Sequence, residues 1–271
     1  MVAPLPSATI APPAVSSDQR PQIHYPDSDG QPMADNTKQF RWITIIHYNL
    51  DWLFSKEEQV FVAGDLLWYP VEGNNKIRQA PDVMVVFGAA KGDRGSYQQW
   101  KEGGIAPQVV FEILSPGNTL KEMHRKQIFY DRYGVEEYYI YDPDRNDLSG
   151  CLRGEMGLEI IDNFTDWVSP RLSIRFNHSE TDLQLLRPDG TPFTRYDEIA
   201  EQLEAALHTV NLERERAAQE RERANQEAQA RYDAISRLLA LGLSVEQVAT
   251  ALGFSEAEIR EAQRAEGSAL T

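Results

Sequence analysis

Hydrophobic residues in the first half of the chain fall into blocks whose spacing predicts one helix followed by several strands. Five of them recur at helical spacing: Phe40, Ile43, Ile46, Leu50 and Leu53. Asn36 precedes them as the expected N-cap, so a helix is predicted from there to Phe54. Three apolar runs bounded by turn residues follow at 59–70, 80–88 and 107–115. The last two are rich in Val, Ile and Phe, which predicts central strands of a sheet.

A strand, helix, strand unit is predicted over residues 112–142. Apolar residues within 120–133 have helical spacing, and Gly134 is an expected stop residue for that helix. The segment 136–144 follows directly as another strand. Further short strands of a partly antiparallel sheet are predicted at 151–161 and 168–187. The expected fold class is therefore α/β, with a mixed β-sheet core flanked by helices.

Composition divides the chain into four segments. Residues 1–34 are rich in Pro, Ser and Asp and poor in large apolar side chains, which predicts a disordered N-terminal arm. Residues 35–192 hold the predicted α/β domain. Glu, Arg, Ala and Gln dominate residues 193–232, a composition typical of a long charged helix. Residues 233–271 are predicted to form a small helical segment.

The charged helix carries a seven-residue period, because ERERAAQ at 213–219 is nearly repeated by ERERANQ at 220–226. Its seam would hold six apolar residues: Ile199, Leu203, Ala206, Val210, Ala217 and Ala224. Glu213 and Glu220 fall on the alternate seam positions, so a tight coiled coil is poorly supported. Two alternatives remain, a homodimer held weakly through this helix or a solvated helix stabilised by Glu–Arg pairs.

The C-terminal segment is predicted to contain short helices separated by Gly242 and Gly253. Capping-box spacing joins Ser244 to Gln247 and Ser255 to Glu258. The pattern resembles a helix-turn-helix, but its last helix is acidic. Because acidic side chains repel DNA phosphates, a protein-contact or capping role is favoured over DNA binding.

The net negative charge of the chain restricts how this protein can bind nucleic acid. The 271 residues have a formal net charge of −15, and residues 39–190 hold 16 Lys and Arg against 23 Asp and Glu, a net charge of −7. Any contact with DNA must therefore be local. The candidate cations lie in the loop 91–104 and on the helix 120–133: Lys91, Arg94, Lys101, Lys121, Arg125 and Arg132. The alternative is a scattered, solvated set of charges.

The sequence also indicates the cellular compartment of the protein. A single cysteine, Cys151, excludes an internal disulfide and any cysteine-rich zinc site. The sequence contains neither an apolar run long enough to span a membrane nor a signal-peptide pattern. The protein is therefore expected to be cytoplasmic, with no membrane partner.

Other candidate groups give weaker signals. Tyr97 and Trp100 in the loop 91–104 could stack on bases or anchor the loop to the core. The five histidines show no metal-ligand spacing. His47, on an amphipathic helix, is interpreted as a packed histidine rather than a ligand.

Two acidic residues stand inside strands otherwise made of apolar residues: Asp82 in APDVMVVF and Glu112 in QVVFEILS. A buried carboxylate without a partner is costly, so such residues are usually paired, hydrogen-bonded or metal-bound. On adjacent strands the two carboxylates could share a Mg²⁺ ion, which prefers hard oxygen ligands. The alternative is that each acid lies at a strand end and caps a neighbouring loop.

Lys126 lies 14 residues after Glu112, on the following predicted helix. From there its ammonium could lie over the sheet end, where it would orient or deprotonate an attacking water and stabilise negative charge. Glu122, four residues earlier, could pair with it. The alternative is a solvated helix lysine. Asp82, Glu112 and Lys126 together predict a divalent-metal phosphodiesterase site.

Five stretches carry a family resemblance over roughly residues 36–190: APDVMVVFG, KGDRGSYQQWKEGG, PQVVFEILSPGNT, RKQIFYDRYGVEEYYIYDPD and VSPRLSIRF. They resemble the Uma-two family of putative restriction endonucleases, of the cyanobacterial type, within the PD-(D/E)XK nuclease superfamily. The resemblance implies a restriction-endonuclease-like fold. It also implies that Asp82 is the acid of the PD pair and that Glu112 is the acid of the second strand.

The superfamily pattern places a lysine two residues after the second acid, where this chain has Leu114. In the resembling family a helix lysine substitutes, and its match here is Lys126, with Tyr130 one turn later. The backbone carbonyl of Ile113 is implied as a further metal ligand, and Mg²⁺ or Mn²⁺ as the cofactor. Gln39, on the first helix, is the implied additional polar residue.

The predicted function is that of a Mg²⁺-dependent endonuclease that hydrolyses DNA phosphodiester bonds. An alternative from another class is a non-catalytic protein-interaction scaffold that retains the nuclease fold. The net charge of −15 motivates this alternative, because strong acidity opposes the binding of a polyanion.

Overall fold

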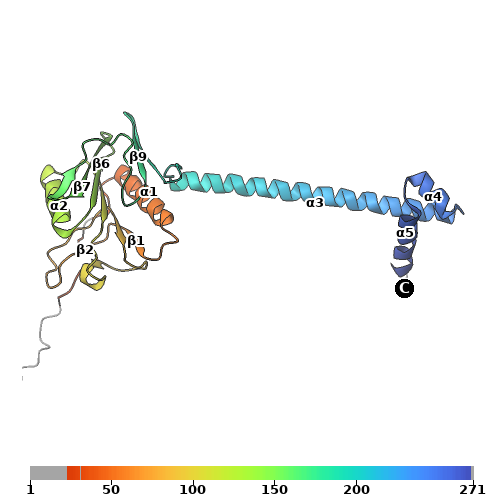
Figure 1. Cartoon of the computed structure of the whole chain (residues 1–271), viewed down its shortest axis with the longest axis horizontal. Helices are drawn as coiled ribbons and strands as arrows, with labels where there is room; N and C mark the ends of the chain where they lie inside the picture. Colours follow the sequence, from red (N-terminus) through yellow and green to blue (C-terminus); the bar gives the residue numbers. More distant parts are fainter. Residues whose placement is uncertain (1–22, 31, 270–271) are drawn as a thin grey trace, which may run out of the picture. The chain divides into compact units, whose positions relative to one another are not determined.

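The computed structural model describes residues 23–30 and 32–269, with side chains described as far as residue 262. The chain divides into two compact units, one ending at Arg195 and the other beginning at Tyr196 (Figure 1). The first unit contains the β-sheet, and the second is helical. Within the described ranges, no helix is both long and apolar enough to span a membrane.

A six-stranded mixed sheet forms the centre of the first unit. Its strands are β1 (Val60–Gly64), β3 (Val83–Phe87), β5 (Val109–Ile113), β6 (Glu137–Asp142), β7 (Asp147–Gly154) and β8 (Gly157–Ile160). They are arranged across the sheet in the order β1-β3-β5-β6-β7-β8. Strands β5 and β6 run parallel, and the other neighbours in this sheet run antiparallel. The predicted α/β class with a mixed sheet is confirmed.

The two faces of the sheet are covered by different helices. In β3, Val83 and Val85 pack into one hydrophobic cluster and Met84 into another, as the alternation of a pleated strand requires. Helix α1 (Thr37–Leu53) packs into the first cluster and helix α2 (Leu120–Tyr133) into the second. Figure 1 shows α1 and α2 on opposite sides of the strands.

The ends of both helices are set by local hydrogen bonding. The side chain of Asn36 accepts hydrogen bonds from the N–H groups of Lys38 and Gln39 at 2.9 and 2.8 Å. Thr119 caps the start of α2 in the same way. Gly134 ends α2 in a left-handed backbone conformation with φ of 93°, which glycine adopts readily. The two predicted helices are therefore confirmed, and Asn36 and Gly134 set the ends that they were expected to set.

Some predicted strands are divided in the structure. The run 59–70 forms β1 and then β2 (Trp68–Tyr69), because Asp65 between them has a left-handed backbone with φ of 48°. Strand β2 pairs in parallel with β4 (Tyr97–Gln98), which is followed by the 3-10 helix η1 (Gln99–Lys101). The region 168–187 contains an antiparallel pair, β9 (Arg175–His178) with β10 (Leu183–Leu186).

The described part of the predicted N-terminal arm contacts the domain. Tyr25 packs against the rings of Tyr69 and Trp100, with ring centroids 5.2 and 5.0 Å apart. The Tyr69 hydroxyl donates a hydrogen bond to the carbonyl of Pro26 at 2.7 Å. Here the structure differs from the predicted disorder, because aromatic packing offsets the entropy of ordering the chain. Residues 1–22 of the predicted arm lie outside the described residues.

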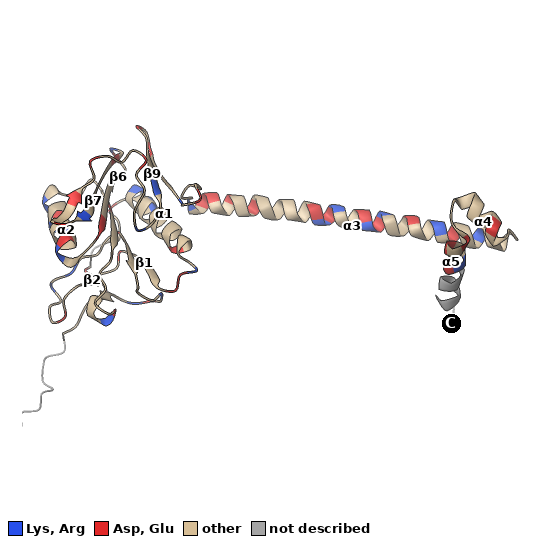
Figure 2. Ribbon diagram, in the orientation of Figure 1, with Lys and Arg blue, Asp and Glu red and all other residues tan. Residues whose placement is uncertain are grey.

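The described residues of the second unit form three helices: α3 (Tyr196–Ala240), α4 (Val245–Leu252) and α5 (Glu256–Ala269). Helix α3 continues past the boundary predicted at residue 232. Figure 2 shows acidic residues in its first part and acidic and basic residues interleaved from about its middle on. The end of α3 shares a small core with α4 and α5: Ile235, Val248, Ala249, Ile259 and Ala262. This core explains why α3 continues beyond residue 232, because the buried residue that α3 supplies to it is Ile235. The weak homodimer through α3 remains a prediction.

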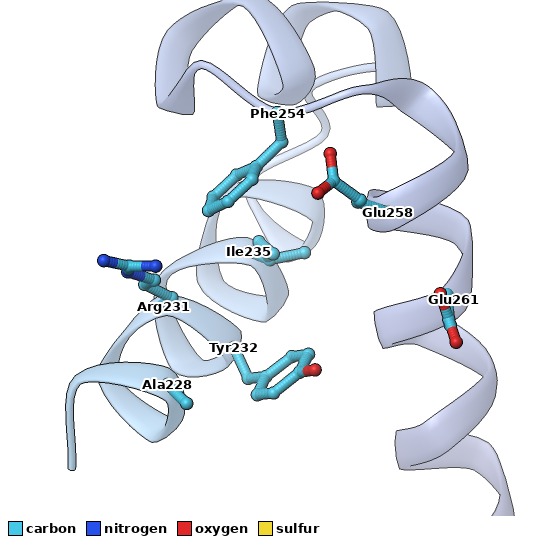
Figure 3. A pocket seen from close by; sticks show the side chains of 7 residues that line it. All are labelled: Ala228, Arg231, Tyr232, Ile235, Phe254, Glu258 and Glu261. Carbon is cyan, nitrogen blue, oxygen red and sulfur yellow. The ribbon is translucent and has the colours of Figure 1, made fainter. Parts of the chain in front are cut away.

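A cavity of about 320 Å³ lies within this C-terminal unit (Figure 3). Its lining includes the apolar groups of Tyr232, Ile235 and Phe254 and the carboxylates of Glu258 and Glu261. Glu258 is engaged in its predicted cap, where it accepts hydrogen bonds from the N–H and the hydroxyl of Ser255 at 2.8 Å each. Arg231 also lines this cavity, so it carries two acidic side chains and one basic side chain, a balance that does not favour phosphate.

Candidate metal-dependent site

The two strand acids predicted as metal ligands lie beside each other at one end of β3 and β5. The pairing of Val83 with Phe111, continued by one residue, places Asp82 next to Glu112. Oδ2 of Asp82 accepts a hydrogen bond from the N–H of Ile113 at 2.6 Å. The two acids are buried, with 8% and 2% of their surface exposed. Carboxylates at this depth need donors or a cation.

Helix α2 supplies two donors to Glu112. Nζ of Lys126 lies 2.7 Å from Oε2 of Glu112. Tyr130, one turn later, donates its hydroxyl to Oε1 of the same carboxylate. Residues four apart share one face of a helix, so a single face of α2 holds both oxygens. The structure therefore brings Asp82, Glu112 and Lys126 together, while their catalytic roles remain predictions.

The electrostatics of the site follow from its burial. Burial, and then the charge of Glu112, raise the pKa of Asp82 well above its ordinary value, and Lys126 opposes this shift. Burial alone lowers the pKa of Lys126, but the charges of Glu112 and Asp82 outweigh it and the pKa is raised overall. The pKa of Tyr130 is raised by burial and by Glu112, which keeps its hydroxyl a hydrogen-bond donor.

Gln39 links helix α1 to the end of β5. Its Nε2 donates a hydrogen bond to the carbonyl of Ile113 at 2.8 Å, and its Oε1 accepts one from the N–H of Asp35 at 2.8 Å. The carbonyl predicted as a metal ligand therefore already accepts one hydrogen bond, and one lone pair remains for another partner. Leu114, at the usual lysine position, donates its N–H to the carbonyl of Tyr141 at 2.8 Å and carries no charge.

An acidic cavity of about 290 Å³ lies over these residues. Its charged lining consists of Asp29, Asp35, Asp65, Asp82 and Glu122, with Lys126 as the cation. Glu122, predicted to pair with Lys126, accepts a hydrogen bond from Asn118 at 3.3 Å. Its negative charge still raises the pKa of Lys126, although burial and the charges of Glu112 and Asp82 act on that group more strongly. In the described part of the chain, the ammonium of Lys126 pairs with Glu112 rather than Glu122.

Asp65 is a site residue that the sequence reasoning missed. Burial, and then the charge of Asp29, raise the pKa of its carboxyl, while Lys126 lowers it and Glu112 raises it further. An acid within an apolar run is the pattern that identified Asp82, and Asp65 stands within the run QVFVAGDLLWYP at 59–70. The same signal could therefore have found it.

The donor set suits a hard divalent cation by charge. When ionised, Asp65, Asp82 and Glu112 carry three negative charges against the single positive charge of Lys126. Carboxylate and carbonyl oxygens are the ligands that Mg²⁺ prefers, and this ion keeps several of its waters. Among the described residues, no group of three or more His, Cys, Asp or Glu side chains is arranged to hold a metal ion. A bound ion would therefore depend on Asp82, Glu112, the carbonyl of Ile113 and water.

The loop 91–104 is anchored to the domain. Tyr97 is fully buried, its hydroxyl donates to the carbonyl of Ile105 at 2.8 Å, and its ring stacks on Phe61. Arg94 forms an ion pair with Glu102 at 2.9 Å and lies over the ring of Phe61. Tyr97 therefore anchors the loop, and burial makes it unable to stack on bases.

The predicted local basic surface is reduced by pairing. Lys91 lies 3.5 Å from Asp51, and Arg94 is engaged as described. The remaining four cations are exposed: Lys101, Lys121, Arg125 and Arg132. The last three belong to α2, the helix that also carries Lys126 (Figure 2).

The chain is similar to a family of proteins and to a solved structure. A crystal structure from Anabaena variabilis, described as a putative nuclease belonging to DUF820, is 16% identical in sequence. That match covers 52% of this chain and 74% of the other, with a TM-score of 0.39. No curated protein matches the chain. Residues 17–189 match the Uma2 family, described as putative restriction endonuclease. Because the match spans more than half of the sequence, this chain belongs to the Uma2 family of putative restriction endonucleases.

Proposed function

We propose that this protein is a divalent-metal-dependent nuclease that hydrolyses phosphodiester bonds in DNA. The observation that carries the proposal is the meeting of Asp82, Glu112 and Lys126 at one end of the sheet, in a member of a family of putative restriction endonucleases. Phosphodiester hydrolysis requires a positioned water and stabilisation of negative charge on the phosphate oxygens. These three side chains are suited to both tasks.

Each residue has a proposed role. Asp82 and Glu112, with the carbonyl of Ile113, would hold Mg²⁺ or Mn²⁺, which when bound supplies Lewis-acid stabilisation of the phosphate charge. Lys126 keeps its ammonium at Glu112, where it can donate a hydrogen bond to the attacking water or to a phosphate oxygen. Tyr130 holds the second oxygen of Glu112, and Gln39 orients the carbonyl of Ile113.

The surface around the site limits how DNA can approach. The cavity wall is acidic, which opposes a phosphate, whereas Lys121 and Arg125 are exposed on the helix that carries Lys126. We expect the DNA backbone to follow these cations. With few phosphate contacts, DNA binding should be weak, and its dependence on salt should be shallow, because that dependence grows with the number of phosphates neutralised.

Cleavage assays test the proposal. Purified protein is incubated with supercoiled plasmid and with single-stranded circular DNA, in Mg²⁺ or Mn²⁺. We expect cleavage that a chelator abolishes and that falls on the order of 100-fold in Asp82→Asn, Glu112→Gln and Lys126→Met, because each removes charge stabilisation at the reacting group.

The matched control is Glu159→Gln, which removes one negative charge from an exposed position on β8 of the same sheet. It should cleave as the unchanged protein does. Wild-type activity no higher than that of an Asp82→Ala/Glu112→Ala double variant would contradict the proposal.

The second candidate, a non-catalytic interaction scaffold, is favoured by the acidic wall of the cavity and the net charge of −15. Metal titration separates the two. A ligand that binds the folded state alone must stabilise it, by about 2.7 kcal/mol at one hundred times its Kd. A melting temperature unchanged by millimolar Mg²⁺ and Mn²⁺ would favour the scaffold.

A further inference from the structure

The main chain of Asp65 is attached to the strand end that carries Asp82. Strand β1 pairs with β3 as far as Gly64 and Val83. Beyond that pair, the N–H of Asp65 points at two carbonyls, those of Pro81 at 3.1 Å and Asp82 at 3.3 Å. Its φ of 48° is a conformation that Asp tolerates better than most residues with a side chain. The backbone therefore holds Asp65 beside the predicted metal ligand.

The carboxylate of Asp65 differs from its neighbours in what it contacts. Asp82 accepts a hydrogen bond from a backbone N–H, and Glu112 accepts from both Lys126 and Tyr130. Asp65 lines the same cavity, yet within the described ranges no donor lies at hydrogen-bond distance from its carboxylate. Both of its oxygens remain able to accept from a molecule in the cavity.

The arrangement of the acids decides how Asp65 could act on a cation. In the described portion, no three acidic, histidine or cysteine side chains are placed to ligate one ion together. Asp65 is therefore not a third direct ligand beside Asp82 and Glu112. The charges of Lys126 and Glu112 nevertheless act on Asp65, and its own charge raises the pKa of Asp82. Because Mg²⁺ keeps several waters, a carboxylate beside its direct ligands can accept hydrogen bonds from them.

We propose that Asp65 is a positioning residue, which holds a water of the cation bound by Asp82 and Glu112 and thereby completes the site. This inference rests on the proposed metal-dependent function. The water donates a hydrogen bond to Asp65, which orients its lone pairs away from that carboxylate. No bond is made or broken in this role, and the proton stays with the water.

Mn²⁺ binding to the full-length chain tests the inference without relying on catalysis. Calorimetric titration compares the wild type with Asp65→Asn and Asp65→Gly, both of which tolerate the left-handed backbone. Each should bind Mn²⁺ about tenfold more weakly, the size of effect typical for groups that act through a metal-bound water. The melting temperature without metal should not fall in either variant, since each loses a carboxylate repelled by its neighbours.

The matched control is Asp29→Asn, which removes the same charge from another position in the cavity lining. We expect its Mn²⁺ affinity to stay within about threefold of the wild type, because loss of general attraction alone has a small effect in a solvated cavity. An equal loss in Asp29→Asn and Asp65→Asn would overturn the positioning role. So would unchanged Mn²⁺ affinity in both Asp65 variants.

Cleavage measured in the same preparations separates this inference from the proposed function. Wild-type protein that binds Mn²⁺, loses affinity on substitution of Asp65, and cleaves no DNA would contradict the nuclease while supporting the role of Asp65. DNA cleavage by the wild type, with Mn²⁺ affinity unchanged in both Asp65 variants, would support the nuclease and contradict the role of Asp65. Wild-type protein that binds no Mn²⁺ would overturn both.

Discussion

Glu112 is the residue on which the site depends most, because its carboxylate is buried and held on both oxygens. Its two oxygens are held by Lys126 and Tyr130, and 2% of its surface is exposed. Removing one partner of such a pair leaves a buried charge without compensation. The stability of the site in the absence of metal therefore comes from helix α2.

Replacing Lys126 by Met should destabilise the metal-free protein by about 3–5 kcal/mol, the usual cost of an uncompensated buried charge. Urea unfolding measures the loss. Addition of Mn²⁺ should restore part of it, because a cation at Glu112 replaces the missing positive charge. Lys121→Met, on an exposed position of the same helix, is the control and should change stability by less than about 0.5 kcal/mol. Equal losses in the two variants would contradict this account.

Glu137 offers a test of electrostatics away from the site. It is fully buried and accepts hydrogen bonds from the hydroxyls of Ser169 and Tyr139 and from the N–H of Arg171. Burial raises its pKa above the ordinary value of 4.5, although these donors oppose the shift. A carboxyl with a raised folded pKa stabilises the folded state fully at pH values below its unfolded pKa, and that contribution is lost as pH rises through the folded pKa.

The Glu137→Gln variant lacks this titration. Its free energy of unfolding, relative to that of the wild type, should therefore increase as pH rises from 4.5 through the raised folded value. Urea unfolding of both proteins at a series of pH values between 4 and 7 measures the difference. A difference that stays constant over this range would refute the assignment.

At the scale of elements, local signals predicted the helices better than the strands. The cap at Asn36 and the stop at Gly134 lie where the sequence placed them, because capping is decided within one turn. The run 59–70 was predicted as one strand, although Asp65 divides it. An aspartate inside an apolar run carries no turn signal as strong as Gly-Pro or Asn-Gly, so its left-handed backbone is set by the fold.

The site shows the same limit. Asp82 and Glu112 stood out because acids are rare in apolar strands, and the family resemblance pointed to Lys126. The residues that hydrogen-bond to the predicted metal ligands could not be identified from the sequence in the same way. Whether Gln39 reaches the carbonyl of Ile113 depends on how α1 crosses the sheet, and no spacing along the chain reports that distance.

The cap of α1 connects element and site, since Asn36 holds the N–H of Gln39. Asn36→Ala should destabilise the protein by about 1 kcal/mol, because two N–H groups at the helix start lose their acceptor. Asn36→Ser keeps an acceptor and should retain most of that stability. Thermal unfolding of the three proteins measures the effect. Equal destabilisation in both variants would show that the side chain acts through something other than capping.

At the scale of the whole molecule, composition changes close to the point where the two compact units divide. The change to Glu, Arg, Ala and Gln was placed at residue 193, and the compact units divide after Arg195. The end of the long helix was placed less well, because residues 233–240 are more apolar than the charged part yet remain in α3. Their apolar side chains serve the small core with α4 and α5, a contact that composition cannot reveal.

The first unit should fold without the helical unit, because each unit has hydrophobic clusters of its own. Asn49 of α1 exchanges hydrogen bonds with the main chain of Thr194 at 2.9 and 3.1 Å, which ties the end of the unit to its core. A fragment ending at Arg195 keeps these bonds, and its melting temperature should match that of the full chain to within about 2 °C.

A slightly shorter fragment, ending at Gly190, is the matched comparison. It loses Thr194, and with it two hydrogen bonds of the buried Asn49 side chain, which keeps those with Ile45 and Arg187. It also loses Phe193, which packs against the core. Each lost hydrogen bond is worth about 0.5–1.5 kcal/mol, so together with the lost packing the melting temperature should fall by several degrees in a unit of this size. Differential scanning calorimetry of both fragments measures the difference. If the longer fragment melts well below the full chain, the helical unit stabilises the first unit, and the two do not fold independently.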